Sequence, residues 1–210
     1  MGEFRVALTF DAEHPSEPHG SPDGPERILR ELVSAGIRAA FFVQGRWATA
    51  YPALARSMAA EGHLIGNHSH HHARFSLLSA EGARADIRLA EEAIVEVTGT
   101  DPRPWFRFPF GDGAEDDALA DATGLLGYRS VGWSVDPRDW DASVGVERLV
   151  ENIVAGAVGH GDGCVVLLHT WPAATSDAVR SAVRRLRAEG ARFVSIGELP
   201  AVPRTVAVPA

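Results

Sequence analysis

Short apolar runs alternate along the chain with longer segments in which apolar residues recur every three or four positions. The short runs are typical of buried strands, and the longer segments are typical of amphipathic helices. This pattern predicts strands over residues 5–10, 38–43, 64–67, 104–107, 128–133, 163–168 and 192–196. It predicts helices over residues 25–35, 52–61, 79–98, 115–126, 146–158 and 177–189. Strand and helix therefore alternate through the whole chain.

This alternation is typical of an α/β fold, in which helical crossovers connect the strands of a parallel sheet. Because the pattern repeats without a break in composition, we predict a single domain over residues 1–200 that forms a closed or nearly closed barrel. The alternative is an open, doubly wound sheet. A C-terminal tail is expected over residues 201–210, and the Pro- and Val-rich stretch from residue 199 onward is expected to pack loosely.

The charge of the chain narrows the classes of partner. Its 210 residues are 45% hydrophobic and 23% charged, with a formal net charge of -8. An acidic protein is a poor fit to nucleic acid or to an anionic membrane, so a small or neutral substrate is expected. The first ten residues do not have the pattern of a signal peptide, and no apolar run is long enough to span a bilayer. A cytoplasmic location is therefore expected, and the sequence leaves the oligomeric state open.

The single cysteine, Cys164, lies in an apolar run at residues 164–168. It is expected to be a small buried hydrophobe, and it has no second cysteine with which to form an internal disulfide.

The first predicted strand ends in two acidic residues, Asp11 and Glu13, within the stretch LTFDAEHP. Side chains two residues apart on a strand lie on the same face, so these carboxylates are expected to point into the same space. Two carboxylates repel each other unless a positive group lies between them, and a metal ion is one such group. The alternative is a pair of solvated acids that opens a turn.

Four histidines follow the third predicted strand, in the stretch GNHSHHH at residues 66–72. If this stretch is helical, His68 and His72 lie on one face, four residues apart, and can bind one cation. His71 is three residues from His68 and could compete with His72. The alternative is a run of histidines on the protein surface. The apolar strand directly before the stretch argues against this alternative.

An arginine among aromatic residues follows the fourth predicted strand, in the stretch FRFPFG at residues 106–111. Arg107 is placed to be a rigid cation that clamps a carboxylate. The alternative is a tight turn with an arginine that extends to solvent.

The fifth and sixth predicted strands also end in polar residues. The stretch SVDPRDW at residues 134–140 places two acids between Trp133 and Trp140, where the acids could orient a histidine and the indoles could line a pocket or stack on a sugar. The sixth strand ends on His169. The alternatives are a structural turn and a buried structural histidine.

Five polar clusters thus follow five different strands. In a parallel barrel the carboxyl ends of all strands meet at one rim, which is where the active sites of such barrels lie. We therefore expect the five clusters to form one site.

The order of these motifs, TFDAE, GNHSHHH, RFPFG, DPRDW and LLH, resembles that of the polysaccharide deacetylase family, the NodB-homology or carbohydrate esterase 4 group. The resemblance covers residues 9–199. It implies a deformed (β/α)7 barrel of the TIM-like kind. It also implies a divalent metal, most often zinc, with Co²⁺, Mn²⁺ or Ni²⁺ as alternatives, and removal of an acetyl group from an N-acetylated sugar.

The resemblance implies roles for the residues around the metal. Asp11 matches the general base, and Arg107 matches the residue that holds this base. His68 and His72 match the two metal ligands of the H-S/T-x-x-H pattern. Phe110 matches the position whose backbone N–H contributes to the oxyanion hole.

The resemblance also implies roles on the substrate side. His169 matches the general acid, and Asp139 matches the acid that tunes it. Trp140 and Leu167 match the pocket for the acetyl methyl group. Trp171, near the same rim, is expected to contact the substrate.

The first motif departs from the usual family pattern. Most members have two adjacent acids, of which the second binds the metal, but here the second position is Ala12. A branch of the family has an acid-x-acid motif instead, and on that pattern Glu13 is the third metal ligand. His71 and His14 are the alternatives for this ligand.

Two other functions fit the sequence. Several members of the acid-x-acid branch act on cyclic imides or small linear amides, so hydrolysis of such a metabolite is an alternative. A binder of metal or carbohydrate that has lost catalysis is a further alternative, although the base and acid positions, Asp11 and His169, are both filled. The loop at residues 15–24 is expected to set the size of substrate that can enter.

Overall fold

A computed structural model of the chain describes residues 2–14 and 23–204. Its core is a parallel sheet of seven strands, in the order β5-β4-β3-β2-β1-β6 with β7 also paired to β1. The strands are β1 (Phe4–Ala12), β2 (Ala40–Val43), β3 (Leu64–Asn67), β4 (Trp105–Phe106), β5 (Arg129–Ser130), β6 (Cys164–His169) and β7 (Ala191–Phe193). Each predicted strand is present, so the parallel α/β architecture predicted from the sequence is confirmed.

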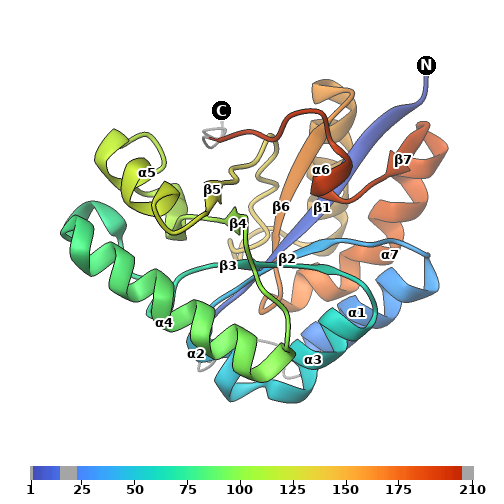
Figure 1. The fold of residues 1–210 in the computed structure, drawn as a ribbon. Helices are drawn as coiled ribbons and strands as arrows, with labels where there is room; N and C mark the ends of the chain where they lie inside the picture. Colours follow the sequence, from blue (N-terminus) through green and yellow to red (C-terminus); the bar gives the residue numbers. More distant parts are fainter. Residues whose placement is uncertain (1, 15–22, 205–210) are drawn as a thin grey trace.

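The six predicted helices are also present, with shifted ends. They are α1 (Gly24–Ser34), α3 (Pro52–Ala60), α4 (Ala80–Thr98), α5 (Asp117–Gly124), α6 (Val146–His160) and α7 (Ala173–Ala188). In Figure 1 the strands cross the centre of the molecule and α4, α3, α1 and α7 run along its outside. Four short elements were not predicted: α2 (Gly45–Ala50), η1 (Phe75–Leu77), η2 (Pro109–Gly111) and η3 (Ile196–Glu198). Each is too short to show helical periodicity.

The sheet curls into an incompletely closed barrel. β6 pairs with β1, and the chain after β5 reaches β6 through one isolated bridge between Val135 and Val166. Val6 pairs with both β6 and β7, so β7 lies on the β2 side of β1 and does not stand between β6 and β1. The order of strands shows no reversal of the doubly wound kind, so the open-sheet alternative is wrong.

Alternation along the strands divides the core into two layers. On β1, Val6 and Phe10 pack outward under the helices, whereas Ala7 faces inward. The inward layer also contains Phe42 and Leu167, and it fills the barrel. Every second residue of a strand lies on the same face of the sheet. A polar residue that continues the inward-facing positions past the end of a strand therefore points into the mouth of the barrel.

Gly66 on β3 is required by this packing. A Cβ at this position would come within 2.7 Å of the Phe42 ring and 3.2 Å of the Trp105 carbonyl oxygen. The absence of a side chain allows β3 to lie against its neighbours directly before the histidine stretch.

The C-terminal segment packs more tightly than predicted. Leu199 is buried with the inward layer, and the Gly132 N–H donates to the Pro203 carbonyl at 2.6 Å. β5 has only two paired residues, so the backbone after it needs other partners, and the segment at residues 199–204 supplies them. The expectation of loose packing is wrong over this part, and residues 205–210 lie outside the described chain, as do residues 15–22 of the loop expected to control substrate size.

The expectation for the single cysteine is met. Cys164 is fully buried, and burial raises the pKa of its thiol to about 12. Within the described ranges, none of the helices combines the length and the apolar character that crossing a bilayer requires.

A buried histidine next to β3 makes stability depend on pH. His63 Nδ1 accepts a hydrogen bond from the Ala39 N–H at 3.1 Å, and burial, together with the nearby Arg38 cation, lowers the pKa of His63 to about 4. The unfolded chain binds this proton near pH 6.5, so the contribution of neutral His63 to stability is complete above that pH and is lost as the pH falls toward 4.

We predict that the metal-free protein loses about 2–3 kcal/mol more unfolding free energy between pH 7.5 and 4.5 than the His63→Leu variant loses. Urea unfolding of both proteins at the two pH values measures this difference. Equal losses would show that His63 does not remain neutral in the folded state.

Candidate active site

The polar clusters predicted from the sequence meet at one cavity of about 470 Å³ at the carboxyl ends of the strands. It is lined by Asp11, Glu13, His14, His68, His72, Arg74, Phe110, Trp133, Asp136, Trp140, Leu167, His169 and Trp171. Each of the five motifs contributes at least one of these residues. The expectation that the motifs form one site is therefore correct.

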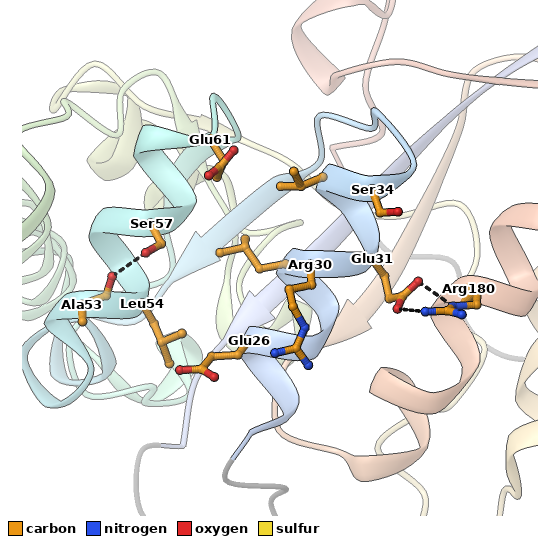
Figure 2. Close-up of a pocket in the computed structure, with 11 residues that line it drawn as sticks. Glu26, Arg30, Glu31, Ser34, Ala53, Leu54, Ser57, Glu61 and Arg180 are labelled. Atoms are coloured by element: carbon orange, nitrogen blue, oxygen red, sulfur yellow. Dashed lines mark hydrogen bonds and ion pairs between the residues drawn. The ribbon is translucent and has the colours of Figure 1, made fainter.

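A second hollow, of about 660 Å³, lies on the helical exterior between α1 and α3 (Figure 2). Its wall includes the Glu31 carboxylate, which pairs with Arg180 of α7 at 2.6 Å. None of the residues predicted for the site lies there.

Strand parity explains why the site residues converge. Asp11 and Glu13 continue the inward positions of β1, and both are buried. His169 continues the inward positions of β6, two residues beyond Leu167. The expectation that Asp11 and Glu13 share one face is met because the alternation of β1 extends past its paired residues.

Glu13, His68 and His72 form a group that could hold a metal ion. One ligand atom from each residue lies within 4.8 Å of the others, and all three residues are buried or nearly so. Glu13 Oε2 lies 3.0 Å from His68 Nε2 and 2.5 Å from His72 Nε2. Two imidazole nitrogens and one carboxylate oxygen are a donor set typical of catalytic zinc sites.

The protonation of these groups also fits a metal ion. Burial raises the pKa of Glu13, but hydrogen bonds from His14, His68 and His72 outweigh burial and hold this pKa well below its usual range, so Glu13 is an anion. His68 Nδ1 lies 2.9 Å from the Arg107 carbonyl oxygen and donates to it, which leaves Nε2 as the atom that faces Glu13. The residues present therefore fit a divalent cation.

The histidine stretch is a loop, so the expectation of a helical turn is wrong. Ser69 and His72 both have left-handed backbones, with φ of 64° and 57°. The Ser69 N–H donates to Asn67 Oδ1 at 2.8 Å, and the His72 N–H donates to Ser69 Oγ at 3.0 Å. These local hydrogen bonds replace those of a helix, and the turns that they form bring the imidazoles of His68 and His72 together.

The structure separates the two alternatives for the third ligand. His71 points away from the cavity, with Nδ1 2.5 Å from Asp86 Oδ1 and its side chain more than half exposed. His14 lines the cavity, and its Nε2 lies 3.2 Å from Glu13 Oε1. His14 is thus a hydrogen-bond partner of Glu13, whereas His71 takes no part in the group.

Asp11 is held by a buried arginine. Arg107 Nη1 donates to Asp11 Oδ1 at 2.7 Å, and Arg107 Nη2 donates to Thr9 Oγ1 at 2.9 Å. Its guanidinium also lies 4.1 Å from the Phe42 ring centroid. The second Asp11 oxygen lies 3.5 Å from His68 Nε2, so it faces the candidate metal ligands. This clamp has the geometry predicted for Arg107.

His169 is held by Asp139 in a similar way. Its Nδ1 lies 2.7 Å from Asp139 Oδ1, and its backbone N–H donates to Asp139 Oδ2, also at 2.7 Å. Burial lowers the pKa of His169, but Asp139, together with the Glu13 and Asp11 carboxylates, outweighs burial and raises this pKa to about 10. His169 Nε2, the ring nitrogen that does not contact Asp139, lies 3.9 Å from Glu13 Oε1. His169 is therefore a cation that can present a proton to the cavity.

Aromatic side chains form the rest of the wall. Leu167, Trp140 and Trp171 line the cavity as predicted, and the Trp171 indole N–H donates to Glu13 Oε1 at 3.3 Å. Phe110 also lines it, with a left-handed backbone (φ 59°) and a ring that lies 4.5 Å from that of His72.

Several supporting residues were not predicted from the sequence. Asp86 of α4 accepts hydrogen bonds from the His70 and His71 N–H groups, and Thr175 donates to Asp139 at 2.7 Å. Asp86 could have been identified from the sequence, because it is an acidic residue on the apolar face of its helix, beside Ala83 and Ile87. Thr175 has no comparable signal, since its partner is distant in sequence.

Comparisons with known proteins show the family to which the chain is similar. The sequence profile described as "Polysaccharide deacetylase" matches residues 1–131, more than half of the chain. A peptidoglycan-N-acetylglucosamine deacetylase of Bacillus cereus is 31% identical over 200 residues, which cover 91% of this chain and 66% of that protein. A chitooligosaccharide deacetylase of Azorhizobium caulinodans is 33% identical over 169 residues, which cover 80% of this chain and 75% of that protein.

A solved structure is also similar. The family 4 carbohydrate esterase from Streptomyces lividans, in complex with acetate, is 27% identical and superposes with a TM-score of 0.78. The match covers 92% of this chain and 93% of that chain.

We predict that the purified protein binds one zinc ion per chain and that Glu13→Ala no longer retains it through gel filtration, because two imidazoles alone leave the site one ligand short. His71→Ala is the matched control and is expected to retain zinc. Metal analysis by inductively coupled plasma mass spectrometry measures both. Stoichiometric zinc in Glu13→Ala would contradict the assignment of Glu13.

We also predict that Asp86→Ala weakens zinc binding by about 10–100-fold, because it removes the acceptor that fixes the loop carrying His72. Asp86→Asn keeps one acceptor oxygen and is expected to lose less. Competition with a chromogenic chelator measures the zinc affinity. An unchanged affinity in Asp86→Ala would show that the loop keeps its shape without this carboxylate.

Proposed function

The chain belongs to the polysaccharide deacetylase family, and on that basis we propose that it hydrolyses the N-acetyl group of an acetylated sugar or oligosaccharide. The observation that carries this proposal is the arrangement of three units in one cavity. Asp11 clamped by Arg107, the group Glu13-His68-His72, and His169 clamped by Asp139 lie next to one another. Hydrolysis of an amide needs a base, an electrophilic centre and an acid, and this arrangement supplies a place for each.

We propose zinc as the metal, with Co²⁺, Mn²⁺ or Ni²⁺ as alternatives, held by Glu13, His68 and His72. When bound, such a cation supplies Lewis-acid chemistry that lowers the pKa of a water molecule and polarises the acetyl carbonyl. The small, buried donor set with nitrogen ligands supports zinc over calcium or magnesium, which prefer oxygen ligands.

Asp11 serves as the general base. Arg107 holds one of its oxygens and leaves the other directed at the metal ligands, where it can take a proton from the attacking water. The full burial of Arg107 keeps bulk water from competing for this contact.

His169 serves as the general acid. An amide nitrogen leaves poorly unless it is protonated, and His169 carries a proton at neutral pH because Asp139 stabilises its cation. The backbone N–H of Phe110 is proposed to donate to the developing oxyanion, and one such donor contributes about 3 kcal/mol in comparable enzymes. Leu167 and Trp140 receive the acetyl methyl group, and Trp171 contacts the sugar.

The alternative is hydrolysis of a cyclic imide or a small linear amide by the same residues. The acid-x-acid spacing of Asp11 and Glu13 favours it, whereas the indoles of Trp140 and Trp171 on the cavity wall favour a sugar face. Acetate release from acetylated chito-oligosaccharides and from peptidoglycan fragments, assayed beside ring opening of simple imides, separates the two. Ring opening without acetate release would replace the first proposal by the second.

We predict that Asp11→Asn and His169→Ala each lower kcat by at least about a hundredfold while zinc content stays stoichiometric. His160→Ala, which changes an exposed histidine at the end of α6, is the control and is expected to leave kcat unchanged. Acetate release measured with a coupled assay gives the rates. Near-normal turnover in either site variant would contradict the assigned base or acid, and equal turnover in all three would remove both.

A further inference from the structure

The two carboxylate oxygens of Glu13 have different partners. Oε2 lies 3.0 Å from His68 Nε2 and 2.5 Å from His72 Nε2, within the group that could hold a metal ion. Oε1 accepts from the Trp171 indole N–H at 3.3 Å and lies 3.2 Å from His14 Nε2. An ionised carboxylate can only accept hydrogen bonds, so His14 Nε2 carries the hydrogen of this contact. The carboxylate is thus divided between an oxygen at the candidate metal ligands and an oxygen that N–H donors hold.

His169 is close to the same oxygen but does not hold it. Its Nε2 lies 3.9 Å from Glu13 Oε1, which is too long for a hydrogen bond. Glu13 is buried, and a buried carboxylate oxygen without a donor is costly. Within the part of the chain that the structure describes, His14 and Trp171 are therefore the side chains that compensate Oε1.

His14 is itself fixed in place. Its backbone is left-handed, with φ of 52°, which is uncommon for a residue other than glycine. The His14 N–H donates to the side-chain oxygen of buried Gln44 at 3.1 Å, and the Gln44 N–H donates to the Ala12 carbonyl at 2.9 Å. The imidazole meets the rings of His72 and Trp171 edge-on, with centroids 4.7 and 6.0 Å away. These contacts keep Nε2 directed at Glu13.

The position of Glu13 in the chain explains why its carboxylate needs such contacts. β1 ends at Ala12, so the pairing of the sheet does not extend to Glu13. A glutamate also has one more rotatable bond than an aspartate, and this freedom must be lost when the side chain is ordered. A carboxylate can bind a cation through one oxygen or through both. The groups that hold Oε1 therefore decide how Glu13 can bind a metal.

We propose that His14 and Trp171 are positioning residues that make Glu13 bind the metal through Oε2 alone. This inference rests on the proposed metal site and deepens it. Binding through one oxygen gives the metal three protein ligand atoms, which leaves the fourth position of a tetrahedral site open for water. The two residues act through Glu13, and the ring of Trp171 can still contact the sugar while its N–H is engaged.

The absorption spectrum of the protein loaded with Co²⁺ tests the proposal, because four-coordinate Co²⁺ absorbs visible light more strongly than five-coordinate Co²⁺. Trp171→Phe and His14→Phe each keep an aromatic ring and remove the N–H. In the double variant Oε1 is free to join the metal, so the visible absorption per bound Co²⁺ is expected to fall about twofold or more. His14→Gln keeps an N–H donor and is expected to retain the wild-type spectrum.

Trp140→Phe is the matched control. It removes an indole N–H from the wall of the same cavity, but this N–H contacts Asp136 at 3.3 Å and not Glu13. Its Co²⁺ spectrum is expected to equal that of the wild type. A loss of absorption in Trp140→Phe as large as in Trp171→Phe would contradict the specific role of the Trp171 N–H.

Metal content separates the two levels of the account. A wild-type protein that binds neither Co²⁺ nor Zn²⁺ would contradict the proposed metal site and, with it, the proposed function. Stoichiometric Co²⁺ with the same spectrum in the wild type and in the double variant would contradict the role of His14 and Trp171 alone. A weak, five-coordinate spectrum in the wild type would also overturn this role.

Discussion

The site is organised around two carboxylates, Asp11 and Glu13, that the inward face of one strand carries into a buried cavity. Their exposed fractions are 3% and 4%. A buried charge without a partner costs several kcal/mol, so each of these groups needs its own compensation. Arg107 provides it for Asp11, and the imidazoles of His68 and His72 provide it for Glu13. The contacts that compensate the two buried charges also direct one oxygen of each carboxylate toward a common point.

The barrel supplies the geometry for this compensation. Its interior is filled by an apolar layer that includes Ala7, Phe42 and Leu167, so the polar residues of the same parity can occupy only the mouth. Arg107 crosses this layer and is fully buried, and it is held there by Thr9 as well as by Asp11. The division between packed interior and polar mouth therefore follows from the alternation of side chains along each strand.

Most of this arrangement could be predicted from the sequence, because it depends on local patterns. The parity of Asp11, Glu13 and His169 follows from the strands that precede them. The path of the histidine loop could not be predicted, since Ser69 and His72 adopt left-handed backbones that depend on Asn67 and on Ser69 itself.

Contacts between segments that are far apart in the sequence could not be predicted either, because they do not depend on a local pattern. The support of Asp139 by Thr175 joins the loop after β5 to the first turn of α7, and the packing of residues 199–204 depends on the short length of β5. The pairing of β7 with the β2 side of β1 could not be predicted either, because no local sequence pattern indicates it.

The central claim is that Glu13, His68 and His72 together bind one divalent cation. Anomalous diffraction from crystals grown with zinc, recorded on both sides of the zinc absorption edge, tests it most directly. The account predicts one peak at about 2.0–2.2 Å from a Glu13 carboxylate oxygen and from one nitrogen of each imidazole. A peak at His71 and Asp86, or no peak between the three side chains, would contradict it.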